Sequence, residues 1–405
     1  MSRKPVIAIV AALGLAALAG CGSQADGETP KADSDGKGGA KQVTITLASG
    51  ASGDTCKVDA TSAKAGPVTF TVKNESAAGI TEFELLDDQK IIGEKENLAP
   101  GLPASTFTLT LGGGDYQIYC PGATKERIPF KVTGKAAAAP TGDAATLLAK
   151  GAQGYNGYVQ SQVASMVTGV TNLQKAVDSG DVAKAQQAYA EARPFYEKIE
   201  SDVEGFVKPG SSPTDNHGNL DYLIDMRASN LDPTVGWSGF HAIERDLFQA
   251  KKVTPTTKKY AADLTTNVGE LAKVAKTLTF KPEDLANGAA GLLEEVQANK
   301  ITGEEEAYSH IDLVDIADNV EGAQQAFAAL QPGLQKVDPD LTKTIGDRFT
   351  AVNNMLDTYR DPNAVGGYRT YTPALKASDG KKLSGAVQAL QDSLSRLAEK
   401  VATAR

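Results

Sequence analysis

The chain has 405 residues, which is enough for two or three domains. Its formal net charge is −9, and 22% of its residues are charged. This acidic balance argues against binding to nucleic acid or to anionic lipid surfaces, and it suits the binding of cations. Solubility alone would explain the same charge, so composition leaves the choice between these two explanations open.

Residues 1–20 form a predicted export signal. Arg3 and Lys4 make a basic start, and an apolar run too short to span a bilayer follows them. The stretch Leu18-Ala19-Gly20-Cys21 resembles the bacterial lipobox. That resemblance implies cleavage before Cys21 and a lipid on its thiol. Secretion with a free thiol at Cys21 is the alternative, and it is disfavoured because an exposed unpaired Cys is a liability in an oxidising place.

No later segment approaches a continuous apolar run of about 18 residues, so the lipid is the only predicted membrane anchor. Residues 21–42 are rich in Gly, Asp, Lys and Ser, which predicts a disordered tether. Residues 43–133 differ, because Val43–Leu47, Val68–Val72 and Phe107–Leu111 alternate with a period of two. Such short strands, separated by Gly, Pro and Asn turns, predict a β-sandwich.

A linker is expected at residues 134–143, where Ala, Pro and Gly cluster. In residues 144–405, Ala, Leu, Gln, Lys and Glu dominate, and apolar residues recur every three or four positions. Residues suited to begin helices stand at Asp181, Ser238, Thr302 and Asp338. The pattern predicts seven or more helices in an all-α domain, with two four-helix bundles as the expected arrangement.

His241 and Glu244 are the most informative pair in this helical part. Phe240, Ile243 and Leu247 make the apolar stripe of a helix, and the spacing of three residues puts the imidazole and the carboxylate on one face. Two side chains so placed can share a metal ion, as in di-iron bundles. A lone His-x-x-Glu pair is more often a surface hydrogen bond, so its context decides.

Other carboxylates supply that context. Glu197 and Glu200 repeat the spacing of three on another predicted helix, and Asp225 stands in a predicted polar loop before the His241 helix. Carboxylates from two helices and one imidazole would form a hard site suited to Fe2+, Fe3+, Zn2+ or another divalent ion. The alternative for Glu197 and Glu200 is a solvated face paired with nearby basic residues.

Three blocks of the helical part resemble imelysin-like domains. Gly239–Glu244 looks like the Gly-Phe-His-x-x-Glu signature of that family, and Arg193–Glu200 is similar to its Arg-x-x-Tyr-Glu-x-Ile-Glu helix. Ile301–Asp315 resembles a third block, but it lacks the aromatic residues usual near the end of that block. Together the blocks cover the helical part, and they imply metal binding by His241 and Glu244.

The β part resembles the cupredoxin-like module of EfeO-type iron-uptake lipoproteins. Glu94–Gly101 is similar to the Glu-x-Glu-Asn-Ile-Ala-Pro-Gly loop of that module, and Thr81–Leu85 and Tyr116–Cys120 resemble its flanking strands. The resemblance implies an iron-capturing protein on the extracytoplasmic face of a bacterial membrane, at the cell surface or in the periplasm. It also implies an EfeU-like iron permease and an EfeB-like haem peroxidase as partners.

The β segment contains no His and no Met, which excludes a blue-copper site. The family resemblance makes Cys56, Glu82 and Cys120 candidate ligands for iron, with Zn2+ or Cu2+ as further metals. The alternative for Cys56 and Cys120 is a disulfide, which an oxidising compartment favours. Glu82 and Glu84 flank Phe83 on one strand, so both carboxylates face outward if Phe83 lies in the core.

Imelysin-like domains are also classed among peptidases, so a zinc metallopeptidase is the alternative function. A hydrolytic zinc site needs three ligands, an open position and a general base. The chain lacks His-Glu-x-x-His, and Glu244 would have to serve as either ligand or base. Metal binding without catalysis is therefore the preferred interpretation. A sugar-binding surface is disfavoured, because Trp237 is the only Trp that could contribute to an aromatic platform for sugars.

Overall fold

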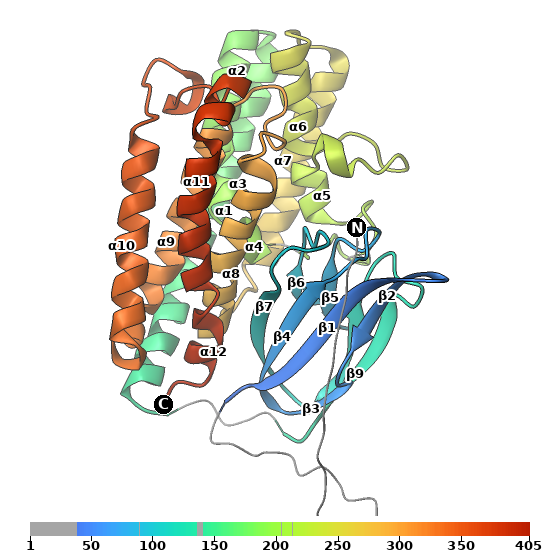
Figure 1. Ribbon diagram of the computed structural model, residues 1–405. Coiled ribbons are helices and arrows are strands. Elements are labelled where there is room, and N and C mark those ends of the chain that lie inside the picture. The colour runs from blue at the N-terminus through green and yellow to red at the C-terminus, as the bar shows by residue number, and fades with distance from the viewer. Residues whose placement is uncertain (1–38, 89, 136–140, 204, 213) are drawn as a thin grey trace, which may run out of the picture. The chain divides into compact units, whose positions relative to one another are not determined.

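The computed structural model describes residues 39–88, 90–135, 141–203, 205–212 and 214–405 (Figure 1). The predicted export signal, the lipidation candidate Cys21 and most of the predicted tether lie outside these residues. None of the described helices is long and apolar enough to cross a membrane.

The β part is a sandwich of a four-stranded and a five-stranded sheet. The strands of the first sheet, in spatial order, are β2 (Gly53–Val58), β1 (Lys41–Gly50), β4 (Gly66–Asn74) and β7 (Ser105–Leu111). Those of the second sheet are β3 (Ser62–Lys64), β9 (Arg127–Thr133), β8 (Gly114–Tyr119), β5 (Phe83–Asp87) and β6 (Lys90–Lys95). The pairs β1–β4 and β3–β9 are parallel and the others antiparallel, so the predicted sandwich is confirmed.

Aromatic side chains from both sheets fill the centre of the sandwich. The ring of Phe70 on β4 lies 5.2 Å from that of Phe107 and 5.5 Å from that of Phe130. Phe83 on β5 is also buried, at 6.3 Å from Phe70. The alternation of inward and outward residues along each strand places these rings on the inner faces, as the sequence pattern predicts.

The rest of the described chain is helical, and the predicted all-α domain is confirmed. Its longer helices are α1 (Asp143–Ser179), α2 (Val182–Ala192), α7 (Pro255–Ala275), α8 (Pro282–Glu295), α9 (Asp312–Val337), α10 (Pro339–Asp357) and α11 (Pro373–Leu394). Its short helices are α3 (Pro194–Glu197), α4 (Glu200–Val203), α5 (Leu220–Asp225), α6 (Gly239–Glu244) and α12 (Leu397–Ala402). Two π-helical turns, η2 (Arg245–Gln249) and η3 (Val296–Lys300), follow α6 and α8 directly. Two 3-10 turns, η1 (Ala228–Asn230) and η4 (Val365–Gly367), lie in connecting segments.

Two of the four predicted helix starts are capped as expected. Asp181 accepts the backbone N–H of Lys184, and Asp338 caps α10 in the same way. Ser238 stands at the start of α6, but its hydroxyl donates to the carbonyl of Leu223 instead. Thr302 begins no helix, because it lies in the turns that follow η3.

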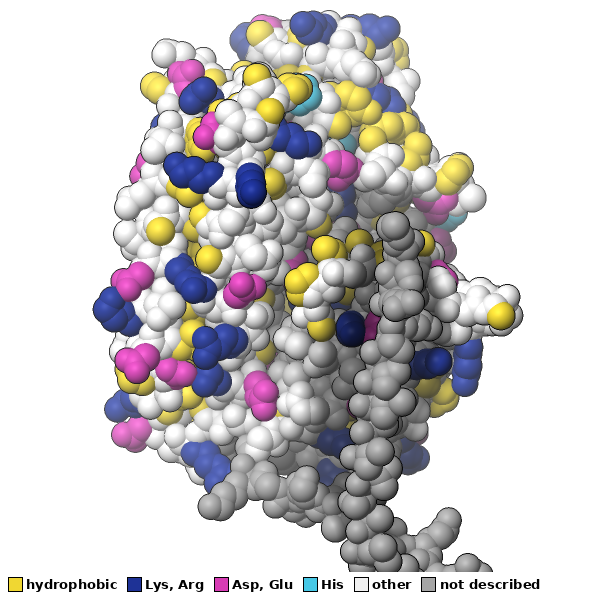
Figure 2. All heavy atoms as spheres, viewed as in Figure 1, with side chains coloured by type: hydrophobic (Ala, Val, Ile, Leu, Met, Phe, Trp, Pro, Cys, Tyr) yellow, Lys and Arg dark blue, Asp and Glu magenta, His cyan; other side chains and the backbone are white. Residues whose placement is uncertain are grey.

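The helices share one continuous apolar core. Helix α1 packs against α2, α7 and α9, while α8 packs against α9, α11 and α12, and α10 against α9 and α11. Figure 1 shows these long helices running side by side. On the face drawn in Figure 2, Lys and Arg side chains alternate with Asp and Glu over the helices, so the described part of this face has no extended basic patch.

Side chains of α8 bond the outer edge of strand β7. Asn287 accepts the backbone N–H of Thr108 at 3.3 Å and donates to its carbonyl at 2.8 Å. Glu283 accepts the N–H of Thr110 at 3.2 Å, and Lys281 donates to its carbonyl at 2.9 Å. Since β7 is the last strand of its sheet, helix α8 satisfies an edge that would otherwise carry unpaired backbone groups.

Candidate metal centre

Helix α6 carries His241 and Glu244 and lies unusually close to α5. Gly239 begins α6 with a φ of +71°, and a Cβ at this position would lie 2.1 Å from the carbonyl oxygen of Ile224. Only glycine permits both this backbone conformation and this approach. The glycine of the Gly-Phe-His-x-x-Glu stretch therefore brings the imidazole of His241 next to the end of α5.

Asp225 is the last residue of α5 and is only 6% exposed. The sequence prediction of a polar loop at this position was wrong, because Leu220 and Ile224 anchor the segment in the core as a helical turn. As a result, Oδ1 of Asp225 lies 3.6 Å from Nε2 of His241. The structure thus brings Asp225 next to the imidazole, and its role as a metal ligand stays a prediction.

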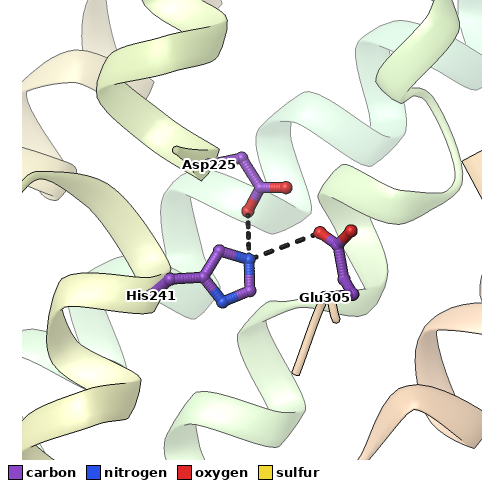
Figure 3. A group of neighbouring side chains, drawn as sticks. All are labelled: Asp225, His241 and Glu305. Carbon is purple, nitrogen blue, oxygen red and sulfur yellow. Dashed lines mark hydrogen bonds and ion pairs between the residues drawn. The ribbon is translucent and has the colours of Figure 1, made fainter. Parts of the chain in front are cut away.

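Glu305 completes the group on this side of His241. It lies in the turns between η3 and α9, is buried, and places Oε1 at 3.3 Å from Nε2 of His241. Figure 3 shows Asp225, His241 and Glu305 pointing toward one another, with both carboxylates directed at the same ring nitrogen. Their ligand atoms all lie within 4.8 Å of one another, so the three residues are able to hold one metal ion.

The other ring nitrogen of His241 faces the carboxylate of Glu244. Nδ1 lies 2.9 Å from Oε2 of Glu244, whose Oε1 accepts the backbone N–H groups of Tyr308 and Ser309, each at 2.7 Å. Glu306 lies within 4.8 Å of this pair. Both sides of one buried imidazole are thus lined by carboxyl groups.

A fully buried arginine holds the acidic residues together. The guanidinium of Arg193 forms ion pairs with five carboxylates, those of Glu197, Asp225, Glu305, Glu306 and Asp315. Because its side chain is fully buried, these interactions replace all of its hydration. Arg193 therefore fixes carboxylates from α3, α5, α9 and the turns before α9 around one point.

Glu197 and Glu200 are buried and do not form the predicted single helix. Glu197 ends α3 and Glu200 begins α4. The ammonium group of Lys300, itself fully buried, lies 3.2 Å from Glu197, 3.4 Å from Glu200 and 3.7 Å from Glu305. The alternative of a solvated face is wrong. Neither glutamate is among the residues grouped with His241 as possible ligands of one metal ion. Glu197 pairs with both Arg193 and Lys300, and Glu200 pairs with Lys300.

The protonation of these groups is strongly shifted. Burial opposes a charged imidazole, but Asp225 and the hydrogen bonds of Glu244 and Glu305 together raise the pKa of His241. Burial raises the pKa of Asp225 to about 7 against the effect of Arg193, and it raises that of Glu306 to about 8. Burial alone would also raise the pKa of Glu305, but Lys300 and Arg227 lower it well below its usual value.

Buried carboxyl groups outnumber the buried cations that face them. The carboxyl groups are those of Glu197, Glu200, Asp225, Glu244, Glu305, Glu306, Asp312 and Asp315, whereas Arg193 and Lys300 are the cations with no exposed surface. Oxygens of Asp312 and Asp315 also have no hydrogen-bond partner among the described residues. Such an excess of buried negative charge is costly unless protons or a metal cation neutralise it.

The β part holds the remaining predicted ligands. Cys56 and Cys120 are joined in a disulfide, with a separation of 64 residues in sequence, so neither sulfur offers the thiolate that metal binding requires. This bond was the alternative that an oxidising compartment favours, and it corrects the family-based choice of these cysteines as ligands. The side chains of Glu82, Glu94 and Glu96 form a cluster of carboxylates, in which one oxygen of each residue lies within 4.8 Å of the others.

Sequence reasoning missed Glu305, Glu306 and Lys300 as parts of the centre. All three come from η3 and the turns after it, where no helical periodicity marks a common face. The available signal was the run of three glutamates at 304–306 inside the third block that resembles the imelysin family.

Comparison with known protein families agrees with this structure, in which a β-sandwich precedes a helical domain that has a buried centre of one His and several carboxylates. The family model described as Imelysin, and named for the M75 peptidases, matches residues 151–397. The chain therefore belongs to the imelysin family.

Relatives that match most of the chain identify the type of protein within this family. Proteins described as "Iron uptake system component EfeO" from Escherichia coli strain K12 and from Shigella flexneri are each 34% identical to it over 346 residues, 84% of this chain and 88% of the relative. The protein of the same description from Escherichia coli O6:H1 is 35% identical over 337 residues, 82% of this chain and 85% of the relative. The chain is thus an EfeO-type protein, as the motifs of both domains predicted.

Proposed function

We propose that this chain is the extracytoplasmic iron-binding component of an iron-uptake system, and that it captures Fe2+ or Fe3+ at His241 for delivery to a membrane permease. The observation that carries the proposal is the convergence of Asp225 and Glu305 on Nε2 of His241. The three residues come from three separate segments and are all buried. The iron-uptake names of the relatives support the choice of cargo.

The donor set has the chemistry that iron prefers. One imidazole nitrogen and two carboxylates suit Fe2+ or Fe3+, and they would also accept Zn2+. We assign His241, Asp225 and Glu305 as direct ligands. Glu244 then has a different role from the one predicted, since it hydrogen-bonds the remaining ring nitrogen and is fixed by two backbone N–H groups. A carboxylate in that position sets the tautomer and orientation of a ligating imidazole.

The zinc-peptidase alternative rests on the name of the family model. Zinc with these three ligands would have the His and carboxylates of a hydrolytic site, and Glu306, with its raised pKa, would be the candidate base. Yet His241 and Glu305 are each only 1% exposed. A polypeptide cannot reach a centre buried to this degree, whereas an ion can, so the geometry favours binding over hydrolysis.

The predicted surroundings of the protein belong to the same proposal. A lipid on Cys21 would hold it on the outer face of a bacterial cell membrane, within reach of an EfeU-like permease that receives the iron. An EfeB-like haem peroxidase would be a second partner. Pull-down from detergent-solubilised membranes with the lipidated chain and with a Cys21→Ser variant tests both the anchor and the partners.

The test of the central proposal is a calorimetric titration of the full-length chain with Fe2+ under anaerobic conditions. The same protein is loaded with Zn2+ and assayed for peptide hydrolysis. We expect tight iron binding in the wild type, loss of that binding in His241→Ala, and no hydrolysis. The variant His217→Ala is the matched control, because His217 is an exposed histidine whose ion pair among the described residues is with Asp215.

Three results would contradict the proposal. Iron binding that is equal in His241→Ala and wild type would remove His241 from the site. Equal losses in the His217→Ala control would show that the effect is not specific. Zinc-dependent hydrolysis combined with weak iron binding would replace the uptake function with the peptidase function.

A further inference from the structure

An acidic cavity of about 250 Å3 lies where the sandwich meets the helical domain. Glu82, Glu94 and Glu96 line it from the β part, and their carboxylate oxygens approach within 4.8 Å of one another. Asp221 of α5 lines it from the helical part. We call this cavity, with the four carboxylates named here and that of Glu84, the acidic pocket.

Glu84 shows that the acidic pocket is suited to a cation. Its side chain is only 3% exposed and lines the cavity, and its Oε2 atom has no hydrogen-bond partner among the described residues. Burial, followed by the neighbouring carboxylates of Glu82 and Glu94, raises the pKa of Glu84 to about 10. Buried polar atoms are nearly always paired. Beside the carboxylates of Glu82 and Glu94, a proton or a bound cation would supply the partner that Oε2 of Glu84 lacks among the described residues.

A continuous chain of contacts leads from this pocket to His241. Asn97, next to Glu96, donates to Oε1 of Glu295 at 3.2 Å. Nη1 of Arg227 donates both to Oε2 of Glu295 at 3.0 Å and to Oε2 of Glu305 at 3.2 Å. The other oxygen of Glu305 faces Nε2 of His241 at 3.3 Å. Each link crosses from one segment of the chain to another.

Arg227 is the only cation in this chain of contacts, and it bridges two carboxylates. One nitrogen, Nη1, serves both carboxylates, while Nε has no partner among the described residues. A guanidinium keeps its charge in proteins. Arg227 therefore interacts electrostatically with Glu96 of the acidic pocket and with Glu305 of the His241 centre at the same time.

We propose that Arg227 is a tethered counter-cation that couples the acidic pocket to the His241 centre, so that a divalent cation bound at one lowers the affinity of the other. The inference rests on the proposed function, because it takes the His241 centre to be a metal site. A metal ion on Glu305 competes with Arg227 for that carboxylate and repels the guanidinium. Arg227 then interacts more strongly with Glu295 and Glu96, and its positive charge makes the acidic pocket less negative.

The coupling acts in both directions, because linkage between two binding sites is reciprocal. A cation in the acidic pocket draws Glu96 and repels Arg227 toward Glu305, which weakens binding at His241. The device therefore disfavours two ions in neighbouring sites at once. It keeps the carboxylates neutralised when a single ion passes from the outer pocket to the buried centre.

The experiment measures Fe2+ binding to the full-length chain by anaerobic calorimetry. The affinity of the acidic pocket is taken from the second binding event in wild type and from the remaining event in His241→Ala. We expect the pocket to bind about tenfold more tightly in His241→Ala than in the wild type whose centre is filled, which lies within the usual range of coupling between sites. Glu82→Gln combined with Glu96→Gln should abolish the pocket event alone.

The same comparison is then made in Arg227→Gln and in Arg227→Lys. We expect the ratio of the pocket affinity in His241→Ala to that with a filled centre to fall to near one in Arg227→Gln. The ratio should persist in Arg227→Lys, which keeps the positive charge and so controls for a folding defect. A tenfold ratio that survives Arg227→Gln overturns the proposal, as does the absence of any pocket event in His241→Ala. Absence of the His241-dependent event in wild type is a separate result, and it overturns the proposed function itself.

Discussion

Nδ1 of His241 lies 2.9 Å from Oε2 of Glu244, and the other oxygen of that carboxylate is held by two backbone N–H groups. Glu244 is therefore positioned by the turns before α9 and in turn positions the imidazole. Under the proposed function, the His-x-x-Glu spacing of this helix orients the ring, and the proposed metal-binding nitrogen of His241 is the one that faces Asp225 and Glu305.

Glu244→Gln should weaken Fe2+ binding about 10- to 100-fold without abolishing it, because an outer partner of a ligating imidazole has an effect of that size. Asp225→Asn should reduce binding further, since it removes a direct ligand. Anaerobic calorimetry on both variants measures the difference. The assignment of roles is reversed if Glu244→Gln binds no iron while Asp225→Asn binds it normally.

Iron affinity should rise with pH between 6 and 8. Burial raises the pKa of Asp225 to about 7, and Asp225 together with the hydrogen bonds of Glu244 and Glu305 raises that of His241. Both groups must lose a proton before they bind a metal, so protons compete with iron below these pKa values. We expect about a tenfold loss of affinity for each pH unit and each proton displaced. Titration in two buffers of different ionisation enthalpy counts those protons, and an affinity that is flat across this range would contradict the ligand assignment.

Lys300→Met should destabilise the helical domain by about 3–5 kcal/mol, the usual cost of removing one partner from a buried ion pair. It leaves the carboxylates of Glu197, Glu200 and Glu305 without their common cation. The loss should be smaller at pH 5 than at pH 8, because burial raises the pKa of Glu200 and lets it take up a proton.

Urea denaturation at both pH values measures the effect of Lys300→Met. The control is Lys343→Met, which breaks an exposed pair with Asp347 and should change the free energy of unfolding by less than about 0.5 kcal/mol. Equal effects of the two substitutions would show that Lys300 is not the neutralising cation of this cluster.

Glu84→Gln should stabilise the sandwich at alkaline pH. Burial and the carboxylates of Glu82 and Glu94 raise the pKa of Glu84 from 4.5 to about 10. Above pH 4.5 the unfolded chain releases a proton that the folded chain keeps, so this group makes stability fall as pH rises. The variant should be more stable than wild type by about 1–3 kcal/mol at pH 8 and equal to it at pH 4.5. Thermal unfolding without metal, at both pH values, checks the sign.

The helical features of the centre were predictable where side chains repeat along one face. His241 and Glu244 stand three residues apart in a clear apolar stripe, and that spacing survives in α6. The convergence of Asp225 and Glu305 on His241 was not predictable in this way. It depends on the glycine-permitted contact of α6 with α5, and on turns after η3 that follow no period.

The β part shows the same division. Alternation predicted β1, β4 and β7, because a strand has only two faces. It also predicted that Glu82 and Glu84 face outward if Phe83 lies in the core, and Phe83 is buried. Glu84 is nonetheless buried, because other parts of the chain cover this face. The sequence of a single strand does not contain that information.

Because of the bonds between α8 and strand β7, the two parts of the chain would differ in what each exposes if it were separated from the other. Without the sandwich, Glu283 and Asn287 would simply exchange a backbone partner for water. Without the helices, β7 would expose a row of amides and carbonyls open to pairing with a second copy, which is a known route to aggregation. Removal of the helices would therefore leave the sandwich with an unprotected strand edge, whereas removal of the sandwich would leave only solvated side chains on α8.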